Sequence, residues 1–116
     1  MKRIAALLIG GLLAASPAAA QQVTLINVFE VPQGRLEETI RYWEAARDFL
    51  VQQPGYVSTR LHQAITPDAR FQLINVAVWE SAAAFAAATG RIPQEVRLPP
   101  PEGLRFTPGL FRVIRE

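Results

Sequence analysis

The middle of this chain carries the pattern that most restricts its fold. Pro54 and Gly55 end a helix, because proline cannot donate to the helical ladder and glycine reverses the backbone at little cost. Residues 56–62 and 71–79 are rich in β-branched and aromatic side chains, which predicts two strands joined by a turn. The alanine-rich run at 82–88 follows a serine that is a good N-cap, which predicts a helix.

The preceding part of the chain predicts one further strand and one further helix. Residues 23–31 alternate as a strand does, with apolar side chains on both faces. Pro32 and Gly34 interrupt that strand. Residues 36–50 then repeat large apolar side chains at helical spacing, so a helix is expected to run up to the proline-glycine step.

The last part of the chain is expected to be mostly irregular. Residues 91–108 are rich in proline and glycine, which predicts a long loop, and residues 110–115 predict a final strand. The order strand, helix, strand, strand, helix, strand predicts an α+β fold, the ferredoxin-like βαββαβ arrangement with both helices on one face of an antiparallel sheet. Because the strands are apolar on both faces, we expect a homodimer whose sheets pack face to face.

Three short motifs of this chain occur together in a known family. They are Pro54-Gly55-Tyr56, Trp79-Glu80-Ser81 and Phe85-Ala86-Ala87-Ala88. With these motifs the chain resembles the antibiotic biosynthesis monooxygenase (ABM) domain family over residues 23–115. The resemblance implies a single ABM-like domain at 21–116 and a dimeric α+β barrel.

The beginning of the chain has the organisation of a secretory signal peptide. Lys2 and Arg3 form a short basic start, residues 4–15 are apolar, and small residues lead up to Ala20. A membrane anchor is the alternative, but the apolar run is much shorter than the ~20 residues that span a bilayer. We therefore expect residues 1–20 to be a signal peptide cleaved after Ala20, which gives a periplasmic or secreted bacterial protein without a membrane span.

Charge argues against nucleic acid as a partner. The chain has 12 Lys and Arg against 10 Asp and Glu, and Lys2 and Arg3 account for the difference. Beyond the expected cleavage site the charges balance, and the arginines from Arg35 to Arg115 are scattered rather than gathered in a stripe.

Residue types and spacing give no signal for a cofactor. The chain has no cysteine, which excludes disulfides, thiol catalysis and thiolate metal sites. The sequence has no His/Asp/Glu cluster with metal-ligand spacing and no glycine-rich phosphate loop after a strand. No metal, flavin or nicotinamide is therefore expected.

Asn27 and His62 are the candidate catalytic residues. His62 is the only histidine and could accept a proton near neutral pH; the alternative is a strand histidine with a structural hydrogen bond. Asn27 lies within an apolar strand, where a buried amide costs free energy unless it is hydrogen-bonded. In haem-degrading and quinone-forming members of the family, an asparagine stands about seven residues before the helix-opening glycine, as Asn27 does before Gly34. The resemblance implies that Asn27 donates hydrogen bonds to substrate or oxygen species; a structural amide is the alternative.

Three further residues are candidates for binding a substrate. Asn75 is a polar residue in an apolar strand, facing either a pocket or a dimer seam. Trp43 and Trp79 could flank an aromatic substrate by stacking, although core packing is the favoured interpretation for both. The haem-degrading relatives use a tryptophan and a histidine in or after the second helix, whereas this helix offers Phe85 and no histidine follows His62. Haem degradation by that arrangement is not expected.

Three functions follow as hypotheses. The first, which rests on the resemblance, is an exported monooxygenase that needs no cofactor and oxidises a small phenol, quinol or anthrone-like substrate. The second is a non-enzymatic periplasmic small-molecule-binding or stress-response module of the same fold. If Asn27 and His62 face opposite sides of the sheet, they cannot share a site, which would favour this second function. The third is a structural dimer that binds a partner through residues 91–108, and an exposed apolar patch around Leu98 and Leu104 would support it.

Overall fold

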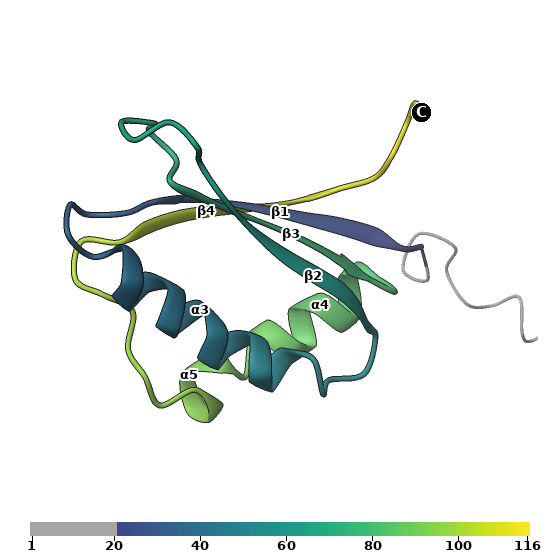
Figure 1. The fold of residues 1–116 in the computed structure, drawn as a ribbon. Helices are drawn as coiled ribbons and strands as arrows, with labels where there is room; N and C mark the ends of the chain where they lie inside the picture. The colour runs from purple at the N-terminus through teal and green to yellow at the C-terminus, as the bar shows by residue number, and fades with distance from the viewer. Residues whose placement is uncertain (1–20) are drawn as a thin grey trace, which may run out of the picture.

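A computed structural model describes residues 21–116, and the expected signal peptide lies outside these described residues. The described residues form one antiparallel sheet, and their helices pack against the same face of it (Figure 1). The elements are β1 (Val23–Glu30), α3 (Leu36–Leu50), β2 (Tyr56–Gln63), β3 (Leu73–Trp79), α4 (Ala82–Thr89), α5 (Ile92–Glu95) and β4 (Arg105–Phe111).

The strand order confirms the ferredoxin-like α+β fold. The four strands lie in the order β2-β3-β1-β4, so β3 and β1 form the centre of the sheet and β2 and β4 its edges. Asn27 in the middle of β1 stands opposite Asn75 of β3 on one side and Pro108 of β4 on the other. This register places the two predicted asparagines side by side at the centre of the sheet.

Turns held by hydrogen bonds lie at both ends of α3. Before the helix, the Arg35 amide donates to the Pro32 carbonyl at 3.0 Å, and Gly34 takes a positive φ of 80° that other residues avoid. After the helix, the Gln53 side chain donates to the carbonyl of Phe49 at 3.2 Å. These turns direct the chain from β1 into α3 and back into β2.

The core lies between the sheet and the helices. Alternate residues of β3 are buried on the helix-covered face, and Trp79 at the end of the strand is 1% exposed. The Ser81 hydroxyl accepts a hydrogen bond from the Ala84 amide at 3.0 Å, which confirms the predicted N-cap of α4. Ala88 of α4 belongs to the same buried cluster as Trp79, and Ala84 packs against that cluster.

The segment at 91–108 differs from the predicted loop. It contains the short helix α5, and β4 begins at Arg105 rather than at residue 110. Pro108 and Gly109, which suggested irregular structure, lie inside β4. A proline is tolerated there because β4 is an edge strand, where one missing amide hydrogen need not interrupt the sheet.

No helix within residues 21–116 covers the opposite face of the sheet (Figure 1), and the strands place apolar side chains there. Ile26 of β1 pairs with Val76 of β3, Val28 pairs with Ile74, and all four are partly exposed. Phe111 at the end of β4 is 52% exposed. Among the described residues, no helix has the length and apolar composition needed to cross a membrane.

Candidate functional site

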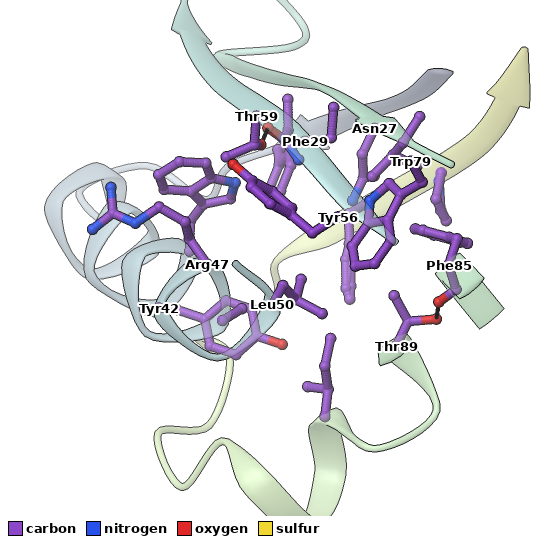
Figure 2. Close-up of a pocket in the computed structure, with 18 residues that line it drawn as sticks. Asn27, Phe29, Tyr42, Arg47, Leu50, Tyr56, Thr59, Trp79, Phe85 and Thr89 are labelled. Atoms are coloured by element: carbon purple, nitrogen blue, oxygen red, sulfur yellow. Dashed lines mark hydrogen bonds between the residues drawn. The ribbon is translucent and has the colours of Figure 1, made fainter. Parts of the chain in front are cut away.

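A cavity of about 310 Å³ lies between the sheet and helices α3, α4 and α5. Figure 2 shows the side chains that surround it. Its lining residues are Leu25, Asn27, Phe29, Tyr42, Trp43, Ala46, Arg47, Leu50, Tyr56, Thr59, Asn75, Ala77, Trp79, Phe85, Thr89, Ile92, Phe106 and Pro108. Asn27, Asn75, Trp43 and Trp79, four of the five predicted site residues, are among them. The volume is at the lower end of the range for small-molecule sites, about 300–1,000 Å³.

The cavity walls are largely aromatic. The Trp79 ring makes edge contacts with Tyr56 at 5.7 Å and with Phe85 at 5.8 Å between ring centroids. Phe29 of β1 and Phe106 of β4 make a similar contact at 5.9 Å. These edge-to-face contacts set the orientation of the rings, and the aromatic walls that they form suit a flat, apolar ligand.

Polar groups gather at one place on the cavity floor. Asn27 and Asn75 are direct neighbours across β1 and β3, and the Thr59 hydroxyl of β2 donates to Asn75 Oδ1 at 2.7 Å. Asn75 is 8% exposed. The Asn27 Oδ1 atom is buried and has no hydrogen-bond partner within the described residues. A buried amide oxygen without a hydrogen bond is unfavourable. A ligand that donates a hydrogen bond to Asn27 Oδ1 would therefore gain binding free energy there.

Two ionisable side chains of α3 also line the cavity. Burial raises the pKa of the Tyr42 phenol above its ordinary value, so Tyr42 is neutral at physiological pH. The Arg47 guanidinium lies over the Trp43 ring, with its central carbon 5.1 Å from the ring centroid. Arg47 is the single charged side chain among the lining residues described by the structure.

His62 does not join the site. It pairs with Ile74, an open-face residue, its side chain is exposed, and Nδ1 lies 3.3 Å from the Ile74 carbonyl oxygen. Strand alternation therefore places His62 and Asn27 on opposite faces of the sheet. The expectation that the two residues share an active site does not hold within this chain.

A β-bulge explains one lining residue that the sequence did not reveal. The β2–β3 register shifts between Tyr56 and Ser58, so Tyr56 faces the cavity together with Thr59 rather than the open face with His62. A plain two-residue alternation places Tyr56 on the wrong face. Phe106 and Pro108 were missed for another reason, since their strand was predicted as loop.

The described residues contain no group of three or more His, Cys, Asp or Glu side chains able to hold a metal ion.

Residues 22–91 match the family model described as antibiotic biosynthesis monooxygenase. A solved structure of a candidate monooxygenase from Shewanella loihica PV-4 is 53% identical, covers 83% of this chain and 97% of its own, and superposes with a TM-score of 0.76. SnoaB, a cofactor-independent oxygenase from Streptomyces nogalater, is 27% identical, with 84% and 97% coverage and a TM-score of 0.64.

A haem-degrading protein from Mycobacterium tuberculosis shares the fold at 23% identity, with 84% and 96% coverage and a TM-score of 0.55. None of the curated proteins is significantly similar to this chain. The family model covers more than half of the chain, and the solved relatives have the same fold. The chain belongs to the antibiotic biosynthesis monooxygenase family.

Proposed function

We propose that this protein is a monooxygenase that oxidises a small, electron-rich aromatic substrate with molecular oxygen and without a cofactor. Phenols, quinols and anthrone-like compounds are the substrate class that the aromatic walls suit best. Membership of the family supports the reaction type, and the 27% identical oxygenase SnoaB supports the absence of a cofactor.

The observation that carries this proposal is the pair of amides in an otherwise apolar cavity. Asn27 and Asn75 are adjacent, and the buried Oδ1 of Asn27 has no partner within the described residues. A substrate hydroxyl could donate to that oxygen, while amide N–H groups could donate to an oxygen atom that becomes negative during the reaction. Donors placed where charge develops are effective catalytic groups in a cavity of low polarity.

The proposed reaction is balanced by the substrate itself. A ring CH₂ group or a phenol loses a proton, and the resulting carbanion or phenolate transfers one electron to molecular oxygen. The two radicals combine to form a carbon–oxygen bond, and a proton gives the hydroperoxide. For a CH₂ group, loss of water then breaks the oxygen–oxygen bond and leaves a ketone, so one oxygen atom enters the product and the other enters water. The electron pair that forms the carbon–oxygen bond and the pair that allows the oxygen–oxygen bond to break both come from the substrate, so no external reductant is needed.

The lining residues of the cavity limit where the first proton can go. The lining residues described by the structure include no imidazole and no carboxylate. The substrate proton would therefore leave to water, and the two amides would lower the energy of the anion that remains. Under this proposal the substrate's own acidity sets the ease of that step.

Oxygen uptake on anthrones, quinols and polyphenols tests the proposal, with metal-free and flavin-free protein. Asn27→Ala and Asn75→Ala should each lower uptake, by about 100-fold if the amide acts as an oxyanion donor. His62→Ala should retain uptake, because that side chain faces away from the cavity. Loss of uptake in His62→Ala but not in Asn27→Ala would contradict the assigned site.

A non-enzymatic binding module is the second candidate function. The separation of His62 from Asn27 favours it, since the cavity then has amides for binding but no obvious base. Tight binding of several panel compounds without oxygen uptake would support this function and reject the oxygenase.

We propose that the open sheet face forms a homodimer and that the chain is exported. The partly exposed apolar residues on that face support the first proposal, and the basic and apolar beginning of the sequence supports the second. Light scattering tests the dimer. N-terminal sequencing of protein from a periplasmic extract tests cleavage after Ala20.

A further inference from the structure

The charge of the cavity is concentrated in one side chain. Arg47 lies on α3 one turn after Trp43, and no other lining residue among those described is charged at neutral pH. Figure 2 shows the Arg47 side chain on the α3 side of the cavity, with its guanidinium group outside the other lining side chains and directed away from the cavity centre. A cation at the edge of an apolar cavity attracts a ligand whose ring system enters while an anionic group stays outside.

The guanidinium group still has donors to offer. Arg47 Nε donates to Asp48 Oδ1 at 3.0 Å, and this is its one side-chain hydrogen bond within the described part of the chain. Guanidinium has five N–H donors, so its outer nitrogens are available for a carboxylate or phenolate. The Asp48 side chain is 71% exposed, and an exposed pair of this kind is weak. A ligand anion can therefore compete with Asp48 at little cost.

The Trp43 ring holds the guanidinium in a defined position. The two side chains are one helical turn apart, and the 5.1 Å stacking distance is within the range of a cation–π contact. A stacked guanidinium loses less side-chain freedom on binding than a free one would. This combination resembles a prepared anion contact more than a solvated surface arginine.

We propose that Arg47 selects anionic ligands, so that the substrate class of this cavity is an aromatic compound bearing a carboxylate or an ionised phenol. The rings occupy the cavity and the anionic oxygen contacts the Arg47 guanidinium at its edge. This inference rests on the proposed function only in using the same cavity, because selection by charge requires binding but not oxygenation.

Two stable quinones provide a direct test. Rhein and chrysophanol differ in a carboxylate against a methyl group at the same ring position, and neither is consumed by oxygen. Both tryptophans of the chain line the cavity, so quenching of their fluorescence reports binding. The wild-type protein should bind rhein more tightly than chrysophanol. Arg47→Gln should weaken rhein binding by about fivefold and leave chrysophanol binding nearly unchanged.

Three further variants separate charge from packing. Arg41→Gln makes the same charge change on an exposed position of α3 that does not line the cavity, and it should preserve the preference for rhein. Arg47→Lys should keep part of the preference, because the charge remains. Asp48→Asn should tighten rhein binding, because it removes the competing carboxylate. The preference should weaken as salt is added.

The outcomes distinguish this proposal from the proposed function. If Arg47→Gln weakened the binding of both quinones equally, Arg47 would contribute packing rather than charge, and the proposal would be overturned. If Arg41→Gln lowered the preference for rhein as much as Arg47→Gln does, the effect would come from net charge, and the proposal would also be overturned. Rhein selectivity that depends on Arg47, in a protein without oxygen uptake, would support this inference while rejecting the oxygenase.

Discussion

A single methyl group added at Gly55 should strongly destabilise this protein, because it would enter space occupied by α4. Gly55 has a φ of 89°, and a Cβ atom built there would lie far inside van der Waals contact of the Ala84 Cβ atom. That neighbour is fixed to the helix backbone and cannot rotate away. Gly55→Ala therefore combines backbone strain with a displacement of α4 from the strand that holds Trp79.

Gly34 provides the matched control for the backbone term. Its φ is 80°, nearly the same, but an added Cβ atom would have no neighbour within 4 Å. Gly34→Ala should cost about 1 kcal/mol, the strain of a positive φ less the gain from a stiffer unfolded chain. Gly55→Ala adds about 2 kcal/mol for overpacking, for a total of about 3 kcal/mol.

Urea unfolding at one fixed protein concentration measures both losses. Ala84→Gly should cost about 1 kcal/mol alone. In the Gly55→Ala background it should also remove the obstructing methyl and with it about 2 kcal/mol of overpacking, for a net recovery of about 1 kcal/mol. Equal losses in Gly34→Ala and Gly55→Ala, or additive effects of the Gly55 and Ala84 changes, would refute the close contact between this turn and α4.

Two further predictions concern pH and assembly. In a Tyr56→Phe variant Tyr42 is the one remaining tyrosine, and its tyrosinate absorbance should appear above pH 10.0 in the folded protein, then shift down on unfolding. Because burial raises the pKa of Tyr42, its contribution to stability is complete below the unfolded pKa and is lost as pH rises through the folded one; a titration unchanged by urea would contradict the burial. Val76→Arg places a charge in the middle of the open sheet face and should halve the mass measured by light scattering, whereas an unchanged dimer would locate the interface elsewhere.

Most of the fold could be predicted from the sequence because its elements are bounded by strong local signals. The Pro54-Gly55 step lies directly before β2, Ser81 caps the start of α4, and Pro32 lies two residues after the end of β1. The final strand could not be placed, since Pro108 argues against a strand wherever its position at a sheet edge is unknown. Edge position is a property of the whole sheet, which local sequence does not reveal.

The candidate site was predictable where residue type stood out against its surroundings. Asn27 and Asn75 were conspicuous as amides in apolar strands, and both line the cavity. His62 was conspicuous as the only histidine, but a count of residue types carries no information about which face it occupies. Tyr56 depended on a one-residue shift in β2, which only pairing with β3 reveals.

The hydrogen bond between Thr59 and Asn75 orients the Asn75 amide before a ligand binds. Since the Thr59 hydroxyl donates to Asn75 Oδ1, the amide of Asn75 cannot rotate freely, and its N–H groups keep one direction before any ligand arrives. The loss of rotational entropy occurs during folding rather than during binding. A Thr59→Val variant would keep the shape of the cavity floor but allow the Asn75 amide to rotate. We therefore expect weaker ligand binding by a protein whose fold is unchanged.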